Sequence, residues 1–261
     1  MKTKRNHYLS RFFSNNFRTE KGKPMWLLDC TNGKVTNRGT GEDSLFMKRR
    51  IWEQSLEDLF EQKIENNTKQ LVDSVLNLPL NTVAGSFTVD RLAEKYSMLY
   101  TYQMQSIMLQ LSNRDKAQSQ VNDEHAVARV LHSNMVPPCN HPFLIRFNHV
   151  LFADKPLVLI DNAVSAYVTP PLNSNSAGSI CFFMPISPYS LIFFGSSVQL
   201  ECFLFSKRYP HAINIYRILQ EDKQCLVASQ NETYIRWLAT KCKYKSFSSK
   251  AVVPKSNRNF I

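Results

Sequence analysis

Glycine is scarce in this sequence, and the phosphate-binding loops that depend on it are missing. The 261 residues include seven glycines. Neither the Gly-x-Gly-x-x-Gly pattern of dinucleotide enzymes nor the Gly-x-x-x-x-Gly-Lys pattern of nucleotide-driven motors occurs. We therefore expect neither a nucleotide cofactor nor a nucleotide-driven motor.

Paired cysteines are missing as well. The six cysteines are scattered, and none forms a Cys-x-x-Cys pair. Disulfide frameworks belong mainly to small secreted domains, so we expect reduced cysteines in the core. Cys139, His141 and His149 have the chemistry of zinc ligands, but the missing paired spacing disfavours zinc. A divalent metal held by other residues stays open.

The sequence has no run of about 20 apolar residues, the length that spans a bilayer. Its most apolar tract, 180–194, is interrupted by Pro185 and Pro188. The basic N-terminus lacks the apolar stretch of a secretory leader. Because 43% of the residues are hydrophobic and 20% are charged, the composition is that of a folded protein. We expect a soluble cytoplasmic protein without membrane association.

Acidic residues are few at both ends of the chain. The 32 Lys and Arg against 21 Asp and Glu give a net charge of +11. Glu20 is the only acid in the first 23 residues, and Glu232 is the last acid. Such basic ends attract polyanions, which predicts nucleic acid or an acidic protein as partner. Soluble basic tails are an equally open interpretation. The candidate nucleic-acid-binding residues are Arg5, Arg18, Lys241, Lys243 and Lys245.

The order of periodic segments predicts an α+β fold. Residues 25–29 and 31–35 predict a hairpin around Asn32-Gly33, which could join a later sheet. Helical spacing of apolar residues predicts helices over three segments, 46–76, 89–111 and 122–132. Short β-prone segments follow Pro142, and they predict a mainly antiparallel sheet. The predicted strands are 143–147, 157–160, 179–184, 191–194 and 198–205.

Two closing helices complete the predicted domain. Helices grouped before strands are typical of α+β proteins rather than of doubly wound sheets. We predict one domain over 1–245, followed by a basic tail over 246–261. Within the domain the predicted parts are a helical part at about 46–135, a sheet part at about 143–205 and closing helices at about 211–240.

The segment 6–17 has the highest density of reactive and aromatic side chains. It contains His7, Tyr8 and Arg11, the groups that acid–base catalysis on a phosphodiester uses. Phenylalanines between arginines also bind single strands, because the rings stack on bases and the arginines contact phosphates. In a third interpretation, the rings anchor the N-terminus in the core and His7 bonds a backbone group. The sequence leaves all three interpretations open.

Acidic groups elsewhere are candidates for the same site. On a helical wheel with ~100° per residue, Glu57 lies roughly 20° from Ile64 on the apolar face. A carboxylate there needs a cation, a histidine or a metal as partner, unless the helix leaves it exposed. Asp161 and Asn162 end the predicted strand 157–160, where polar atoms can face a cleft. Asp-Asn pairs are also common in turns.

Several short motifs occur in the order found in one family. They are His7-Tyr8-Leu9-Ser10-Arg11-Phe12-Phe13 with Phe17, Leu56-Glu57-Asp58-Leu59 with Ile64-Glu65, Ile160-Asp161-Asn162-Ala163-Val164, Met184-Pro185-Ile186-Ser187-Pro188, and Asn214 in a closing helix. The chain resembles the domain-of-unknown-function family four-two-three-eight, with its "HYxPxFxLxxF", "E…IE", "(T/S)DNPV" and "LPLSP" patterns. That family is common in bacteria and on mobile genetic elements, and it implies no established reaction.

The sequence departs from this family at three places. Ser10 replaces the usual proline of the opening motif, and Ala163 replaces the proline after Asp-Asn. Gln103-Met104-Gln105 stands where the family has "RTP".

Two functional hypotheses follow. The first is a nucleic-acid-directed effector, an RNase or other nuclease used as toxin or antiviral defence in conflict between bacteria and phages. His7 would be its acid–base group, Tyr8 and Arg11 would orient phosphate, and Glu57 and Asp161 would polarise the histidine or hold a metal. The alternative is a non-enzymatic protein whose basic termini bind nucleic acid or an acidic partner. The catalytic candidates are His7, Tyr8, Arg11, Glu57, Asp161 and Asn162.

Overall fold

The structure is a computed structural model of the chain, and it describes residues 5–7, 11–40, 47–49, 66–78, 85–92, 142–169, 178–221 and 225–243. The strands are β1 (Arg5–His7), β2 (Trp26–Asp29), β3 (Lys34–Asn37), β4 (Met47–Arg49), β5 (Phe87–Arg91), β6 (Pro142–Phe147), β7 (Leu159–Ile160), β8 (Ser165–Val168), β9 (Ile180–Ser187), β10 (Ser190–Phe194) and β11 (Leu226–Ser229). The helices are α1 (Arg11–Asn16), α3 (Asn66–Leu76), α7 (Ser197–Lys207), α8 (Pro210–Gln220) and α9 (Glu232–Lys243).

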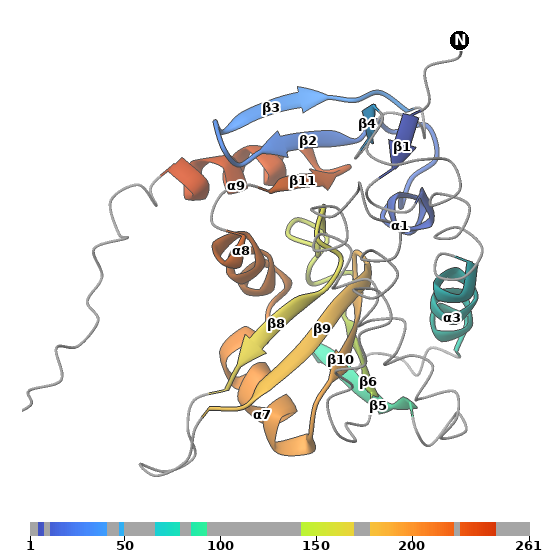
Figure 1. Cartoon of the computed structure of the whole chain (residues 1–261), viewed down its shortest axis with the longest axis vertical. Helices are drawn as coiled ribbons and strands as arrows, with labels where there is room; N and C mark the ends of the chain where they lie inside the picture. The colour runs from blue at the N-terminus through green and yellow to red at the C-terminus, as the bar shows by residue number, and fades with distance from the viewer. Residues whose placement is uncertain are drawn as a thin grey trace, which may run out of the picture.

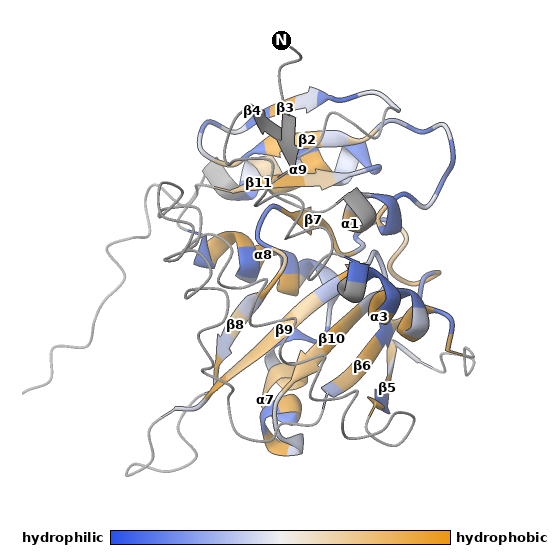
Figure 2. Ribbon diagram, turned by 45° about the vertical axis from the view of Figure 1, so that its right-hand side comes forward, coloured by the Kyte–Doolittle hydropathy of each residue, from blue (hydrophilic) through white to orange (hydrophobic). Residues whose placement is uncertain are grey.

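The larger sheet has five antiparallel strands in the order β5-β6-β10-β9-β8. Its central strands β6 and β10 are buried along their whole length, since both faces of the sheet are covered. Figure 2 shows these strands largely in the orange of hydrophobic residues. Leu200 and Phe203 of α7 belong to the core cluster that this sheet forms. The helices and antiparallel sheets confirm the predicted α+β class.

The smaller sheet has four antiparallel strands in the order β3-β2-β11-β7, and α9 packs against it (Figure 1). Leu28 and Val227 of the sheet meet Ile235 and Leu238 of α9 in a second core cluster. β1 and β4 form a separate two-stranded sheet. Figures 1 and 2 place α8 between the two larger sheets, where it contacts both α7 and α9.

The hairpin around Asn32-Gly33 is confirmed. Gly33 has a positive φ of 69°, which a residue with a side chain rarely adopts. Its N–H donates to the Asp29 carbonyl at 2.8 Å, and the Lys34 N–H donates to Asn32 Oδ1 at 2.8 Å. The second strand begins at Lys34 instead of residue 31. The hairpin joins the sheet that contains β7 and β11, because Leu27 lies opposite Ala228.

One predicted strand is wrong, because residues 198–205 lie in helix α7. Their apolar residues alternate, but they also recur at a spacing of three, so Leu200 and Phe203 can be buried on one helix face. The helix begins with a capping box. The Gln199 N–H donates to the Ser196 hydroxyl at 3.2 Å, and the Ser196 N–H donates to Gln199 Oε1 at 2.7 Å. This Ser-x-x-Gln capping signal favours a helix more strongly than the alternation of apolar residues favours a strand.

Two predicted helices are wrong at their starts. The predicted helix 46–76 contains strand β4, and only α3 at its C-terminal end is confirmed. The predicted helix 89–111 begins inside strand β5, where Val89 lies opposite Ile145 of β6. Pairing with a strand more than 50 residues away overrides the local helical spacing. The remainder of both predictions, apart from α3, and the predicted helix 122–132 lie outside the described residues, as does the tail 246–261.

The other predicted elements are present. The segments 143–147, 157–160, 179–184 and 191–194 correspond to β6, β7, β9 and β10, and the closing helices are α8 and α9. Strand β11, between these helices, was not predicted. No helix in the described part of the chain is long and apolar enough to cross a membrane.

Candidate functional site

The N-terminal candidates are only partly described. Arg5 and His7 lie in β1, opposite Arg49 and Met47 of β4, and Arg11 begins α1. Their side chains, together with Tyr8, Glu57 and Lys245, lie outside the described structure. The convergence of His7, Glu57 and Asp161 therefore stays a prediction.

The phenylalanines of the opening motif have a structural role where they are described. Phe13 is completely buried, and Phe17 is 3% exposed, both in the core of the larger sheet. The interpretation that these rings anchor the N-terminus is confirmed for both of them. They are not available to stack on bases.

Asp161 and Asn162 lie at the end of β7, as predicted. The Asp161 N–H donates to the Leu226 carbonyl, and the Leu226 N–H donates to Asp161 Oδ2, both at 3.1 Å. Asn162 Oδ1 accepts the Val164 N–H at 3.2 Å, while its Nδ2 donates to Glu221 Oε1 at 2.8 Å. These bonds extend the pairing of β7 with β11 and shape a turn, so both residues hold the fold together here.

Arg217 of α8 is a buried cation beside this turn, and the sequence analysis missed it. Its Nε donates to the Ser165 hydroxyl at 3.0 Å. Its Nη1 and Nη2 donate to the carbonyls of Val158 at 3.1 Å and Asn162 at 2.7 Å. Burial lowers the pKa of Arg217 to about 10, against the opposing effect of Glu221. The guanidinium fixes the segment that joins β7 to β8.

Asn214, one turn before Arg217, is another buried polar residue of α8. Its Oδ1 accepts the Val158 N–H at 3.1 Å, and its Nδ2 donates to the Pro156 carbonyl at 2.7 Å and to the Tyr234 hydroxyl at 2.8 Å. Burial raises the pKa of Tyr234, so its hydroxyl stays protonated. The sequence signal for these buried hydrogen bonds was the presence of Asn214 and Arg217 within the otherwise apolar stripe of the helix.

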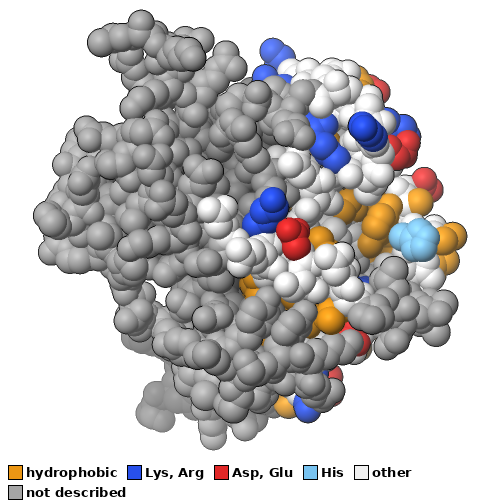
Figure 3. All heavy atoms as spheres, turned by 90° about the vertical axis from the view of Figure 1, so that its right-hand side faces the viewer, with side chains coloured by type: hydrophobic (Ala, Val, Ile, Leu, Met, Phe, Trp, Pro, Cys, Tyr) orange, Lys and Arg blue, Asp and Glu red, His pale blue; other side chains and the backbone are white. Residues whose placement is uncertain are grey.

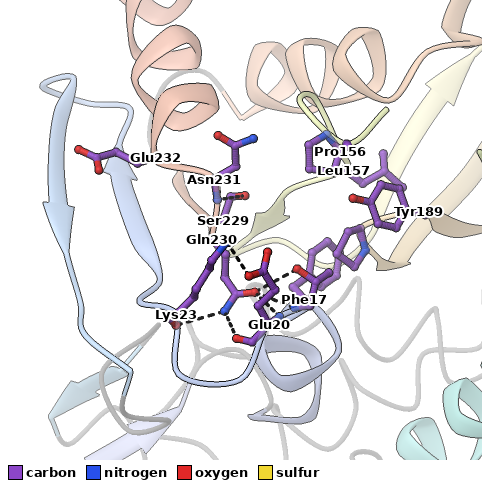
Figure 4. Close-up of a pocket in the computed structure, with 13 residues that line it drawn as sticks. Phe17, Glu20, Lys23, Pro156, Leu157, Tyr189, Ser229, Gln230, Asn231 and Glu232 are labelled. Atoms are coloured by element: carbon purple, nitrogen blue, oxygen red, sulfur yellow. Dashed lines mark hydrogen bonds and ion pairs between the residues drawn. The ribbon is translucent and has the colours of Figure 1, made fainter. Parts of the chain in front are cut away.

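A pocket of about 340 Å³ opens where the two larger sheets meet (Figure 4). Its walls come from the segment after α1, the loop before β7, the β9–β10 turn and the junction of β11 with α9. The Gln230 side chain links this junction to the segment after α1, because its Oε1 accepts hydrogen bonds from the N–H groups of Thr19 and Glu20 at 2.7 and 3.0 Å. Its Nε2 donates to the carbonyls of Glu20 and Lys23 at 2.8 and 3.1 Å. The braced loop gives the pocket a defined shape.

Aromatic and charged side chains surround the mouth of this pocket. Figure 4 shows Tyr189 on one side and the segment from Ser229 to Glu232 on the other. Glu20 forms an ion pair with Lys23. Burial and the nearby Glu20 carboxylate raise the pKa of Tyr189, so the phenol stays neutral. The exposed His149 ring lies 6.2 Å from the Tyr189 ring between centroids.

A row of cations and aromatic rings runs beside the pocket, from the start of α8 to the end of α9. We name it the basic-aromatic strip, and it consists of Arg208, Tyr209, His211, Lys155, Trp237 and Lys241. The Arg208 guanidinium lies 4.8 Å from the Tyr209 ring, which stacks on His211 at 5.5 Å. The ammonium groups of Lys155 and Lys241 lie 5.2 and 5.3 Å from the Trp237 ring. Every member is at least partly exposed.

His211 connects the two halves of the strip. Burial lowers its pKa, and the positive charge of Lys155 lowers it further. The ring is therefore mainly neutral near pH 7 and gains a positive charge in mildly acidic solution.

The other predicted binding residues are distributed unevenly. Lys241 belongs to the basic-aromatic strip, and Lys243 ends α9 two residues further along the chain. Arg18 lies elsewhere, and its Nη1 donates to the Thr40 carbonyl at 3.3 Å. Figure 3 shows that the described part of another face carries basic and acidic side chains close together. On that face charge does not form a single-sign patch.

Within the described ranges, no group of three or more His, Cys, Asp or Glu side chains could hold a metal ion. Cys139 and His141, the other predicted zinc candidates, lie outside those ranges, while His149 lies beside Tyr189. Cys30, Cys181, Cys202 and Cys225 are free thiols, as predicted.

No protein-family model, no curated protein and no solved structure matches this chain. The resemblance to the family named above therefore stays a prediction based on its motifs.

Proposed function

We propose that this protein is a nucleic-acid-directed effector that binds a single strand along its basic-aromatic strip. The observation that carries the proposal is the alternation of cations and exposed rings in that strip, from Arg208 to Lys241. Single-strand binders use cations to hold the phosphate backbone and rings to stack on bases. A net charge of +11 favours the same partner.

The strip supplies both kinds of contact without a large rearrangement. Lys155 and Lys241 each place an ammonium group beside the Trp237 ring, so phosphates next to a base stacked there have two cations within reach. Tyr209 offers a second ring next to Arg208. Because an ammonium or guanidinium already lies near each ring, a bound strand displaces part of a cation–π contact and forms a charge pair with phosphate.

We further propose that the effector is a cytoplasmic RNase or other nuclease of bacterial or phage conflict, with His7 as the acid–base group. Tyr8 and Arg11 would orient the scissile phosphate. Asp161 and Asn162 would have a supporting role in this proposal, since their described hydrogen bonds go to the backbone and to Glu221. The resemblance to the motif family supports this context.

A non-enzymatic interaction protein is the second candidate. The burial of Phe13 and Phe17 favours it, because part of the opening motif then serves packing. Both candidate proteins bind nucleic acid through the strip, but only the nuclease uses His7 for cleavage. We expect His7→Ala to abolish cleavage of single-stranded RNA or DNA while binding persists. A folded His7→Ala variant with unchanged cleavage contradicts the catalytic role, and the absence of any cleavage by the wild type supports the binding protein.

Charge reversal tests the strip itself. The affinity for a fluorescein-labelled 12-nucleotide single strand is measured by anisotropy for Lys155→Glu and Lys241→Glu. Lys69→Glu on the exposed face of α3 is the matched control, because it makes the same change of charge away from the strip. We expect at least about tenfold weaker binding for the strip variants than for the control, because each loses an attraction and gains a repulsion. Equal effects at all three positions contradict the proposal.

A further inference from the structure

We infer that the pocket between the two larger sheets accepts one unstacked nucleobase of a strand bound on the basic-aromatic strip. The inference rests on the proposed function, and it names the part of the ligand that this pocket recognises.

The pocket adjoins the strip. Lys155 belongs to the strip, and its neighbours Ala153 and Pro156 line the pocket. The Asn231 side-chain amide, at the start of α9, donates to the Asp154 carbonyl at 3.1 Å and ties this loop to the helix. Trp237 lies on the same helix, five residues after the lining residue Glu232. Lys155 is therefore a direct chain neighbour of the lining residue Pro156, which puts a base next to a phosphate held by Lys155 close to the pocket.

The size of the pocket fits a single base or nucleoside. Its volume of about 340 Å³ lies at the lower end of the ~300–1,000 Å³ that small-molecule sites occupy. Leu157 and Pro188 are buried and give the walls apolar surface. The half-buried Tyr189 adds a ring, which can stack on any base because every base has an aromatic face.

The polar groups at the pocket favour a base over a phosphate. Glu20 lines the pocket together with Tyr189, and its carboxylate adds to the effect of burial in raising the pKa of Tyr189. The Glu232 carboxylate points away from the pocket and forms an ion pair with Arg236 at 2.8 Å, so Glu20 is the acid that faces the pocket (Figure 4). Carboxylates repel phosphate but accept hydrogen bonds from the N–H groups of a base edge. A phosphate would bind better on the strip outside.

The test measures what one base adds to a strand. A fluorescein-labelled strand of 12 abasic nucleotides is compared with the same strand carrying one central base, so that the single base finds the pocket in any register. We expect the base to increase affinity roughly 5- to 150-fold in the wild type, the range of one stacking contact. Tyr189→Ala removes the ring. Ala153→Trp fills the pocket from an exposed position and leaves the ring in place. Both are expected to lose most of the gain.

The controls separate this inference from the proposed function. Phe205→Ala removes a ring that is 91% exposed on α7, and it is expected to keep the full gain. If the gain from one base is unchanged in Tyr189→Ala and Ala153→Trp while Lys155→Glu still weakens binding, the pocket inference is overturned and the strip stands. If the wild type binds neither strand nor a fully base-bearing one, both fall. Circular dichroism confirms that each variant is folded.

Discussion

The substitution Asn214→Ala tests whether buried hydrogen bonds hold α8 to the loop before β7 and to α9. Asn214 is completely buried, and its amide serves the Val158 N–H, the Pro156 carbonyl and the Tyr234 hydroxyl. Alanine leaves all three groups without this partner. Each unsatisfied buried group costs about 1–3 kcal/mol, so we expect the free energy of unfolding to fall by about 4 kcal/mol. That is a large fraction of the total stability of a domain.

The assay is urea unfolding followed by tryptophan fluorescence and by circular dichroism. Gln220→Ala is the matched control, because Gln220 also donates from α8, to the Ala166 carbonyl at 2.6 Å, but is exposed to water. We expect the control to lose less than about 1 kcal/mol, since water replaces the partner. A loss below about 1 kcal/mol for Asn214→Ala would refute the reasoning, because it would mean that these groups find other partners. Since Pro156 lines the pocket, we also expect weaker binding of the strand with one base.

Three further predictions concern the cap, the histidine and a buried thiol. Ser196→Ala removes the capping bond to Gln199 and should lower the free energy of unfolding by about 1 kcal/mol in urea, whereas a loss under about 0.3 kcal/mol would contradict the role of the cap. The pKa of His211 lies below its usual 6.5 in the folded state, so the unfolded chain takes up the proton first as the pH falls. Stability from this group is therefore complete above about pH 6.5 and is lost below it, and unfolding at pH 7.5 and 5.5 should show a smaller loss in His211→Gln than in the wild type. Burial raises the pKa of the Cys181 thiol to about 12, so iodoacetamide should label Cys181 only after unfolding, and rapid labelling of the native protein at pH 8 would be inconsistent with its environment.

Local signals in the sequence were sufficient for some elements. The Asn32-Gly33 turn is predictable because a positive φ depends on the residue itself. Strands β6 and β10 are apolar except for Arg146 and Ser190, and α8 and α9 carry a clear helical stripe. Where the apolar residues of one segment fit both the strand period and the helical period, the structure that forms depends on the residues against which the segment packs. Residues 198–205 show this, since the cap at Ser196 and burial against the sheet favour the helix.

The candidate site was harder to predict because it depends on distant contacts. Asp161 was identified at a strand end, but its hydrogen bonds to Leu226 come from a strand that is absent from the predictions. The basic-aromatic strip combines Lys155 with residues of α8 and α9, which are distant in the sequence. The sequence alone therefore shows neither that these side chains are neighbours nor that they are exposed. Only its C-terminal member Lys241 was a candidate from charge. The pocket likewise arises where four separate segments meet.

The salt dependence of single-strand binding tests the central claim most directly. With Arg208, Lys155 and Lys241 each neutralising one phosphate, the logarithm of the association constant should fall against the logarithm of salt concentration with a slope of about −2. Lys155→Glu should make that slope shallower by about 0.7 or more, while Lys69→Glu should leave it unchanged. Binding that does not weaken as salt rises, or a slope that Lys155→Glu does not change, would contradict the assignment of the strip as the nucleic-acid interface.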